Sequence, residues 1–576
     1  MTNTVTILTA EQTAEAKNLQ ARLKATQGTP QHNNDSVVAA NDATVDRGDD
    51  HVTQQRLSSL PGEDIATALG LLLVKDQHGK PRAQYMRGMR LSTPPINSRE
   101  IDDLVTECWL SRHGEKGLKP GVELTMTKLR LAAQKSTTKV HLYVRTALRT
   151  LPDGTTQQIL DLGRADGQVV VSDRHGWSFA HNTDIAFAEP DGECALPHRF
   201  DSPQSAYAYL EGWLGSSGVD ESQKLPLVAA LASTLRRDVA YMVIDLNGPA
   251  GSGKTTLVND FSQSVDPSGN GLLVQTPPNH KDIAATSTKR LIIAIDNVSG
   301  LSRELQNLCC QIVYGFVHSE RELYSNHNVA SVTIKCPVFT TGVNPSVTAT
   351  DLLTRTLRIT LAARKKYRRN KQDSEDLRSK ILGALLELLV AGLRHEETDP
   401  DVETRHRMAD VVLFGEGIAK ALGHAAGYFT KLFSESKKRS ASDYAAGDPL
   451  VFSLVRFLRS QESVAVESDK PPSGAEIRKN RGFIIRQSSG KYVAGYTPLR
   501  LVEGVMDAFN KKPTDAGFSW HAGDSLPTNG RAMSVAMNRV MSSILVELGY
   551  QAEKRYLGSP KNNETVFLFG WKPDEE

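Results

Sequence analysis

The sequence is poor in the residues that build metal-bound and disulfide-linked scaffolds. It has five cysteines among 576 residues, with no C-x-x-C spacing, which argues against a zinc site and against a disulfide framework. No run of about 18 apolar residues occurs, so we expect no transmembrane helix. The N-terminus also lacks the basic start and apolar centre of a signal peptide. These absences predict a cytoplasmic protein with no membrane partner.

An excess of charge of either sign is missing too. Lysine and arginine number 68 against 66 aspartates and glutamates, so the formal net charge is only +2. A neutral total does not exclude nucleic acid, because local basic patches decide that question. Apolar residues make up 39% of the chain, which is enough for sizeable cores, and the length corresponds to three or four domains of about 150 residues each.

The most specific pattern that is present is G-x-x-x-x-G-K-[ST] at residues 248–255. An apolar segment, 240–246, precedes it and predicts a buried strand, while 256–261 carries apolar residues at helical spacing. The glycines let the backbone form a nest of N–H groups aimed at phosphate, and the helix dipole adds to it. The residues expected to bind ATP are Gly248, Pro249, Ala250, Gly251, Ser252, Gly253, Lys254, Thr255 and Thr256.

Two loop side chains and one later carboxylate predict magnesium-dependent chemistry. Lys254 would reach the β- and γ-phosphates, and the Thr255 hydroxyl would hold Mg²⁺. Residues 291–295 predict an apolar strand that ends at Asp296, 42 residues after Lys254 (296 − 254). A parallel strand ending in Asp beside such a loop places its carboxylate near the metal. We therefore expect ATP and Mg²⁺ as cofactors, with the metal held by Thr255 and Asp296.

Two asparagines follow predicted strands and are candidate catalytic residues. Asn297 comes directly after Asp296; an amide can hydrogen-bond water but cannot accept its proton. Hydrolysis is then either slow or assisted by another group, such as Asp296 or Glu320. Asn344 ends a third strand, 337–343, and would contact the γ-phosphate or the attacking water; the alternative is a simple Asn-Pro turn.

An arginine follows these strands in the segment Asp351-Leu-Leu-Thr-Arg355. An arginine supplied by a neighbouring subunit can neutralise charge in the transition state of phosphoryl transfer. Its position after the loop, the Asp strand and the Asn strand makes Arg355 a candidate for this role. The alternative is a solvated side chain on a helix.

This order of motifs resembles the superfamily 3 helicases, an AAA+ branch that includes viral replicative helicases. The segment 324–344 resembles the papillomavirus helicase segment in which a β-hairpin with Lys-His at its tip contacts DNA. His327 matches the tip histidine, whereas Asn326 stands in place of the tip lysine. The resemblance implies a homo-oligomer, a hexameric ring, with single-stranded DNA in its channel near His327 and Lys335, and with Arg355 acting on the neighbouring subunit.

A closer resemblance is to ATP-binding, primase- or helicase-like proteins of bacterial phages and integrated mobile elements. It rests on five short segments: 278–282, 296–299, 321–324, 351–355 and 407–410. Proteins of that group also carry Asp-Asn at the second motif, so Asn297 is normal among them. The resemblance covers about 140–422 and implies an α/β fold with an AAA+ P-loop core in three α/β/α layers.

The composition changes along the chain and predicts seven segments, of which that core is one. The first is polar with almost no aromatic residues, which is typical of disorder, and 364–371 has six basic residues in eight. The predicted segments are a disordered tail (1–60), an N-terminal helical domain (61–138), a small β domain (139–200), the ATPase core (201–363), a helical lid or extension (364–433), a linker (434–448) and a C-terminal winged-helix-like domain (449–576).

The C-terminal domain carries a second predicted DNA contact. A helix over 533–548 followed by strands over 550–556 and 564–569 is typical of a winged helix, which binds duplex DNA or another protein. The expected DNA contacts here are Arg539, Lys554 and Arg555.

The motifs together predict an ATP hydrolase, specifically a DNA-dependent ATPase that acts as a hexameric replicative helicase of a phage or mobile element. Two alternatives stay open. One is a nucleotide-gated scaffold with little turnover, which Asn297 favours. The other is an AAA+ regulatory or anti-phage defence ATPase whose target is protein.

Overall fold

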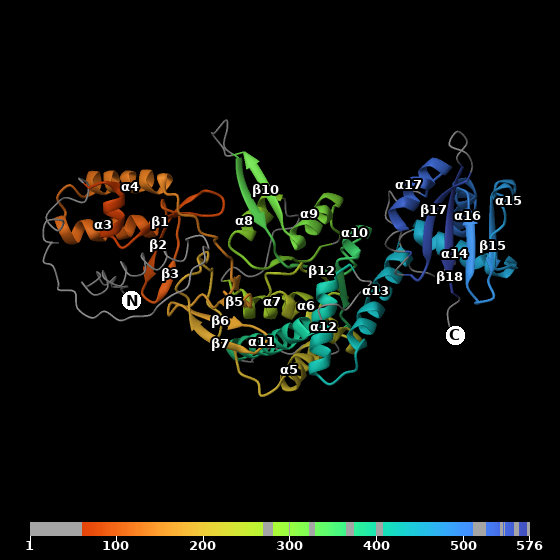
Figure 1. Ribbon diagram of the computed structural model, residues 1–576, viewed down its shortest axis with the longest axis horizontal. Helices are drawn as coiled ribbons and strands as arrows, with labels where there is room; N and C mark the ends of the chain where they lie inside the picture. The colour runs from red at the N-terminus through yellow and green to blue at the C-terminus, as the bar shows by residue number, and fades with distance from the viewer. Residues whose placement is uncertain are drawn as a thin grey trace.

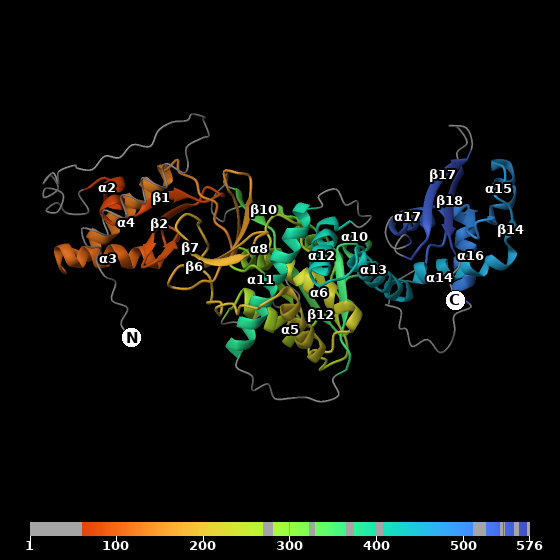
Figure 2. The ribbon, with the colours of Figure 1, turned by 60° about the horizontal axis from the view of Figure 1, so that its bottom comes forward.

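The computed structural model describes residues 60–268, 280–298, 300–321, 329–363, 374–398, 407–447, 449–510, 526–541, 545, 548–557 and 564–572. The N-terminal elements lie at one end of an elongated arrangement and the C-terminal domain at the other, with a parallel sheet between them (Figures 1 and 2). The predicted tail lies outside the described residues except for Leu60. No described helix is both long enough and apolar enough to cross a membrane.

The N-terminal region is not purely helical, which corrects the prediction for 61–138. Its elements are α2 (Gly62–Ala68), β1 (Leu72–Lys75), β2 (Pro81–Arg87), β3 (Arg90–Ser92), α3 (Arg99–His113) and α4 (Leu118–Lys135). The three strands form an antiparallel sheet in the order β1-β2-β3. β1 and β3 are too short for a clear period-2 pattern and β2 does not alternate between buried and exposed positions, whereas α3 and α4 are long enough to show a helical pattern.

Four strands occupy the range in which we predicted a small β domain. They are β4 (Thr146–Thr150), β5 (Thr156–Asp161), β6 (Gln168–Ser172) and β7 (Trp177–His181). Each pairs antiparallel with the next, so the sheet is a meander.

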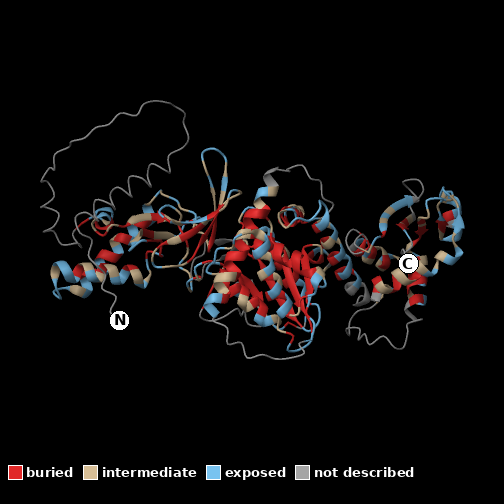
Figure 3. Cartoon of the chain, turned by 90° about the horizontal axis from the view of Figure 1, so that it is seen from below, coloured by how far each residue is buried: buried red, intermediate tan, exposed pale blue. Residues whose placement is uncertain are grey.

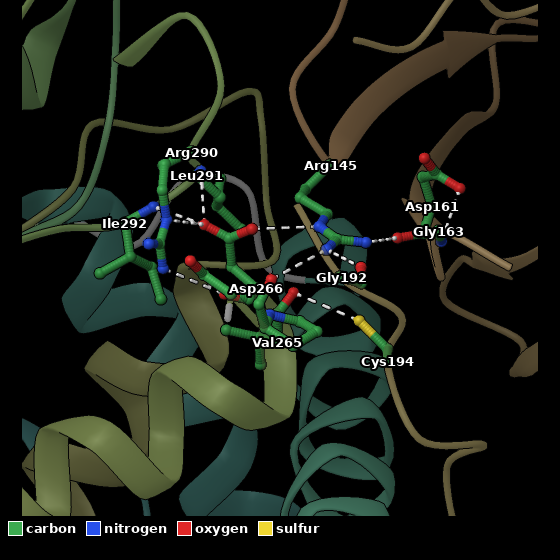
Figure 4. A network of polar contacts seen from close by, with 12 residues as sticks. Arg145, Asp161, Gly163, Gly192, Cys194, Val265, Asp266, Arg290, Leu291 and Ile292 are labelled. Carbon is green, nitrogen blue, oxygen red and sulfur yellow. Dashed lines mark hydrogen bonds and ion pairs between the residues drawn. The ribbon is translucent and has the colours of Figure 1, made fainter. Parts of the chain in front are cut away.

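A buried ion pair joins this meander to the central sheet (Figure 4). Arg145, just before β4, donates from Nε to the Asp266 carboxylate at 3.0 Å, and both side chains are almost fully buried. Asp266 also accepts from the backbone N–H of Leu291 at 2.8 Å, at the entrance to the next central strand. Breaking a buried pair of this kind leaves an uncompensated charge, so the contact fixes the meander to the base of the core.

The central sheet is parallel, as the α/β prediction requires. Its strands are β8 (Val243–Asn247), β9 (Ile293–Ile295), β12 (Val338–Gly342) and β13 (Thr356–Thr360), in the order β13-β8-β12-β9. Every residue of β8 and β12 is buried, because helices cover both faces of the sheet (Figure 3).

Two sets of helices form the outer layers of the core. The helices are α5 (Pro203–Ser216), α6 (Glu221–Ser233), α7 (Lys254–Val265), α8 (His280–Ser287), α9 (Arg303–Tyr314), α10 (Thr350–Leu353), α11 (Ser374–Thr398) and α12 (Ala409–Ala421). Along β8, Ile244 joins the apolar cluster of α6, α7, α11 and α12, and Val243 joins that of α9 and α10. α11 packs into this core, within the range for which we predicted a helical lid or extension.

The predicted linker 434–448 is wrong for the residues that the structure describes. They belong to α13 (Tyr428–Gly447), a continuous helix that leads from the core to the C-terminal domain (Figure 1). Lys437 is buried on this helix, and its ammonium donates to backbone carbonyls of the core. The Ser, Lys and Ala residues that suggested a linker include two strong helix formers, Ala and Lys.

The C-terminal domain is larger than a helix and a hairpin. Its elements are α14 (Pro449–Ser460), β14 (Val466–Glu467), α15 (Gly474–Asn480), β15 (Gly482–Arg486), β16 (Tyr492–Tyr496), α16 (Pro498–Asn510), α17 (Gly530–Val540), β17 (Gln551–Leu557) and β18 (Glu564–Trp571). Within the described residues, the strands form one sheet in the order β14-β15-β16-β18-β17. The expected hairpin, β17–β18, is one edge of that sheet; the winged-helix assignment stays a prediction.

Candidate functional site

The 248–255 loop connects the end of β8 to the start of α7, at the carboxyl edge of the parallel sheet. Gly248, Gly251 and Gly253 have φ values of 146°, 74° and 98°, a region that favours glycine. A Cβ on Gly248 would lie 2.5 Å from the Leu361 carbonyl oxygen, so only glycine allows the loop to pass this close to the chain after β13. Pro249 and Ala250 of this loop are exposed.

The Lys254 ammonium folds back onto the loop. It donates to the carbonyl of Gly248 at 2.8 Å, to the carbonyl of Pro249 at 3.0 Å and to the Ser252 hydroxyl at 3.2 Å. Partial burial lowers the pKa of Lys254, and the negative charge of Asp296 acts against this shift. The structure therefore places a lysine cation within the concave side of the loop, held by acceptors that an anion could replace.

Asp296 lies next to the loop although it is 41 residues from Thr255. The Thr255 hydroxyl donates to Asp296 Oδ1 at 2.8 Å, and the Thr341 hydroxyl of β12 donates to the same oxygen. The parallel register explains the contact, because β8, β12 and β9 lie side by side and end at one edge. Thr341 did not feature among the sequence candidates; the pair of threonines at the end of a buried strand was the signal that could have identified it.

The turn after β9 presents Asn297 at this edge. Asn297 is exposed with φ of 54°, and its backbone N–H donates to the Thr341 hydroxyl at 2.9 Å. The next N–H, that of Val298, donates to the Thr341 carbonyl at 2.8 Å. Asn344 is exposed just beyond β12. Both asparagines thus lie at the same sheet edge as the loop, while their roles in catalysis stay predictions.

A buried polar cluster supports the sheet one layer below this edge. The Asp245 carboxylate of β8 accepts from the Thr340 hydroxyl at 2.8 Å and from the Ser346 hydroxyl at 2.7 Å. Arg358 of β13 lies 3.4 Å from the same carboxylate and also donates to the Ser440 carbonyl of α13. The cluster connects three strands and α13, and no sequence pattern predicts it because its members come from four separate segments.

Arg355 is held within its own chain. It donates to the Asp351 carbonyl at 3.0 Å, makes an ion pair with the Asp351 carboxylate and reaches Cys310 Sγ at 3.4 Å. Arg407, an exposed residue before α12, donates to the other Asp351 oxygen at 2.6 Å. Burial alone would raise the pKa of Asp351, but the two arginines outweigh it and hold that pKa below its ordinary value. A role for Arg355 on another subunit requires it to leave this pair.

The predicted DNA-contacting hairpin is present in part. β10 (Phe316–Arg321) and β11 (Val329–Ile334) pair antiparallel and project from the core beside α8 and α9 (Figure 1). His327 comes between the two strands in the sequence and lies outside the described residues, and the side chain of Glu320 is not described either. Lys335 lies at the foot of the hairpin, where its ammonium donates to the Arg237 carbonyl at 3.0 Å. Burial lowers the pKa of Lys335, and nearby Arg237 acts in the same direction.

The C-terminal candidates are separate from this site. Lys554 and Arg555 lie on the edge strand β17, where Lys554 sits 5.3 Å from the Tyr556 ring centroid and Arg555 pairs with Glu553 at 3.0 Å. Arg539 belongs to α17, but its side chain is outside the described atoms. Their DNA contacts stay predictions, and the charge of Arg555 is largely offset by Glu553.

One family model matches the part of the chain that contains this site. The model of the actinomycete integrative conjugative element replication protein matches residues 218–432, a range that includes every candidate residue from Gly248 to Arg355. Over that range the chain is similar to replication proteins of such elements. No curated protein matches the chain.

Solved structures show only slight similarity. The A form apo structure of the NrS-1 C terminal region has a TM-score of 0.34 at 10% identity, covering 88% of this chain and 97% of that one. A JCV helicase with a bound acetamide compound has a TM-score of 0.19 at 14% identity, covering 42% of this chain and 74% of the helicase. Scores this low carry no argument about function, which rests on the site itself and on the family model.

Proposed function

We propose that this chain is a DNA-dependent ATPase that acts as a helicase-like replication protein of an integrative conjugative element. The observation that carries the proposal is the hydrogen bond between Thr255 and Asp296 at the mouth of a G-x-x-x-x-G-K-T loop. A hydroxyl from the loop and a carboxylate from a neighbouring parallel strand are the pair that holds Mg²⁺ in P-loop nucleotide hydrolases. The match of 218–432 to a replication-protein family supports the biological setting.

Each side chain of the site has a separate role in the proposed ATP hydrolysis. Lys254 exchanges its contacts with the loop carbonyls for the β- and γ-phosphates, while loop N–H groups surround the phosphate chain. Thr255 and Asp296 would hold Mg²⁺, which neutralises phosphate charge when bound. Asn297 and Asn344 orient the attacking water; since neither amide accepts a proton near neutral pH, a carboxylate such as Asp296 at the same sheet edge would have to take it.

The assembly that we propose is a homo-oligomeric ring, a hexamer with single-stranded DNA in its channel. The β10–β11 hairpin projects from each core and would carry His327 toward that DNA. Arg355 would act on the nucleotide of the next subunit once its pair with Asp351 is released, and Arg407 would then keep Asp351 neutralised.

Phosphate release by the full chain tests the proposed activity. We expect turnover of magnesium ATP that rises when single-stranded DNA is added. The Lys254→Ala variant should lose turnover, because its ammonium supplies the charge that the loop places on the phosphates. Lys289→Ala, which removes an exposed lysine outside the loop, is the matched control and should retain the wild-type rate. Turnover that is insensitive to DNA would contradict the DNA-dependent part and would favour a protein-directed ATPase.

A second candidate function is a nucleotide-gated scaffold with little turnover. Asn297 favours it, because the exposed residue after Asp296 carries no carboxylate to act as a base. Under this alternative, ATP binds and promotes assembly, yet phosphate release stays at background with or without DNA. The introduction of Asn297→Asp or Asn297→Glu would then create turnover where the native chain has none.

A further inference from the structure

A cleft lies far from the 248–255 loop, between α13 and the end of the C-terminal sheet. Its volume is about 510 Å³. Residues of α13 line one side, and the segment 548–551 and the end of β18 line the other. The helix α13 reaches this domain from the core (Figure 1). The cleft thus lies where the helix from the ATPase core meets the C-terminal sheet.

Four basic residues line this cleft, and none of its described lining residues is acidic. They are Lys438 of α13, Arg459 of α14, Lys491 before β16 and Lys572 after β18. Lys438 and Lys572 are exposed. Two contacts hold the Arg459 side chain: its Nε donates to the Tyr550 hydroxyl at 2.9 Å, and its guanidinium lies 3.6 Å from the Glu462 carboxylate. The cleft therefore concentrates positive charge in a chain that is nearly neutral overall.

The floor of the cleft is rigid and closely packed. Tyr550 and Trp571 are buried with ring centroids 5.5 Å apart, and the Trp571 indole N–H donates to Glu462 at 2.7 Å. A Cβ on Gly570 would lie 2.9 Å from the Lys491 side chain, so the absence of a side chain there lets Lys491 lie across β18. Its ammonium donates to Gln551 at 2.6 Å. Two of the four cations, Arg459 and Lys491, are thus held by hydrogen bonds to neighbouring side chains.

We propose that this cleft binds the phosphate backbone of nucleic acid. Several cations spread along an open groove, with a buried aromatic floor that offers no stacking face, suit a chain of phosphates better than a single base. The inference rests on the proposed function, because it adds a third nucleic-acid contact to a protein that we propose acts on DNA. The other two proposed contacts are in the ring channel and at the β17 edge.

The same helix connects the cleft to the ATPase site. Lys437, the neighbour of Lys438, points into the core and donates to the carbonyls of Leu353, Thr354 and Thr356 at 3.0, 2.9 and 2.8 Å. Those carbonyls flank Arg355 on both sides. Lys438, which would hold nucleic acid, is the next residue after Lys437, which holds the backbone on both sides of Arg355. Binding in the cleft would therefore bias the position of this arginine.

The test compares two charge-reversal variants of the full chain. Lys438→Glu combined with Lys572→Glu removes two cations from the cleft, and Lys431→Glu reverses an exposed lysine seven residues earlier on α13 that does not line it. Fluorescence anisotropy with labelled single-stranded and duplex DNA gives affinity at several salt concentrations. We expect the double variant to lose about tenfold or more in affinity and its log–log salt slope to become shallower by about 1.5, with Lys431→Glu close to wild type.

The outcomes separate this proposal from the proposed function. If the double variant binds DNA with wild-type affinity and slope, the cleft is not the contact, whatever the ATPase rate. If DNA binding is lost in the double variant while ATP turnover is absent from the wild type, the cleft stands and the ATPase proposal fails. If the two reversals weaken binding to poly-glutamate and leave DNA binding unchanged, the cleft recognises an acidic protein and the proposal is overturned. If the double variant loses more affinity for one form of DNA, single-stranded or duplex, that form is the one that the cleft binds.

Discussion

At the scale of single residues, the site depends on hydroxyl groups as much as on charges. The 248–255 pattern and Asp296 could be predicted because each is defined by a short run of sequence. Thr341 could not, because its contact with Asp296 depends on the register between β12 and β9. Arg355 could be predicted as a candidate, but its surroundings could not, since its partner Asp351 is also paired with Arg407, which lies 56 residues from Asp351 (407 − 351).

Removal of the Thr341 hydroxyl should destabilise the protein and disturb Asn297. In Thr341→Val, the Asn297 N–H loses its acceptor and Asp296 loses a donor, and a hydrogen bond of this kind contributes about 0.5–1.5 kcal/mol to the free energy of unfolding. Urea unfolding followed by circular dichroism measures this loss. Thr341→Ser keeps the hydroxyl and should recover most of the stability; equal stability of the valine variant and the wild type would show that the hydroxyl is not needed.

At the scale of elements, short or polar segments escaped prediction, and long apolar ones did not. β8 and β12 are fully buried and lie in mostly apolar segments, although Asp245 interrupts β8 and two threonines interrupt β12. β1 and β3 have only four and three residues, and the seven residues of β2 do not alternate between buried and exposed positions. α13 looked like a linker because its surface is rich in Ser and Lys, although Lys437 and Ser440 are buried contacts with the core.

The close approach of β12 to the turn after β9 requires a glycine at position 342. A Cβ there would lie 2.5 Å from the Val298 carbonyl oxygen, so Gly342→Ala must separate the two strand ends. We expect a loss of about 1–3 kcal/mol in the free energy of unfolding, together with weaker magnesium ATP binding. Gly300→Ala is the control, because a Cβ at Gly300 meets nothing within 4 Å. Unchanged stability and nucleotide affinity in Gly342→Ala would show that the strand ends are not held this closely.

At the scale of the whole molecule, the prediction of an α/β fold with a parallel sheet is confirmed, and the arrangement around it differs from the expectation. The C-terminal domain is joined to the core by a helix, and one continuous apolar cluster includes Leu308 of α9 as well as Phe567 of β18. An apolar cluster that spans the core and the C-terminal domain cannot be predicted from composition, because it depends on which surfaces meet after each part has folded. Because the two parts share this cluster, experiments on this protein should use the full chain.

The central claim is that the 248–255 loop binds magnesium ATP with the help of Asp296. The most direct measurement is a titration of fluorescent ATP into wild type, Lys254→Ala and Asp296→Asn, with and without Mg²⁺. The account predicts that the wild type binds ATP more tightly with Mg²⁺, that Asp296→Asn loses this enhancement, and that Lys254→Ala binds severely more weakly under both conditions. Wild-type affinity in Lys254→Ala would contradict the account.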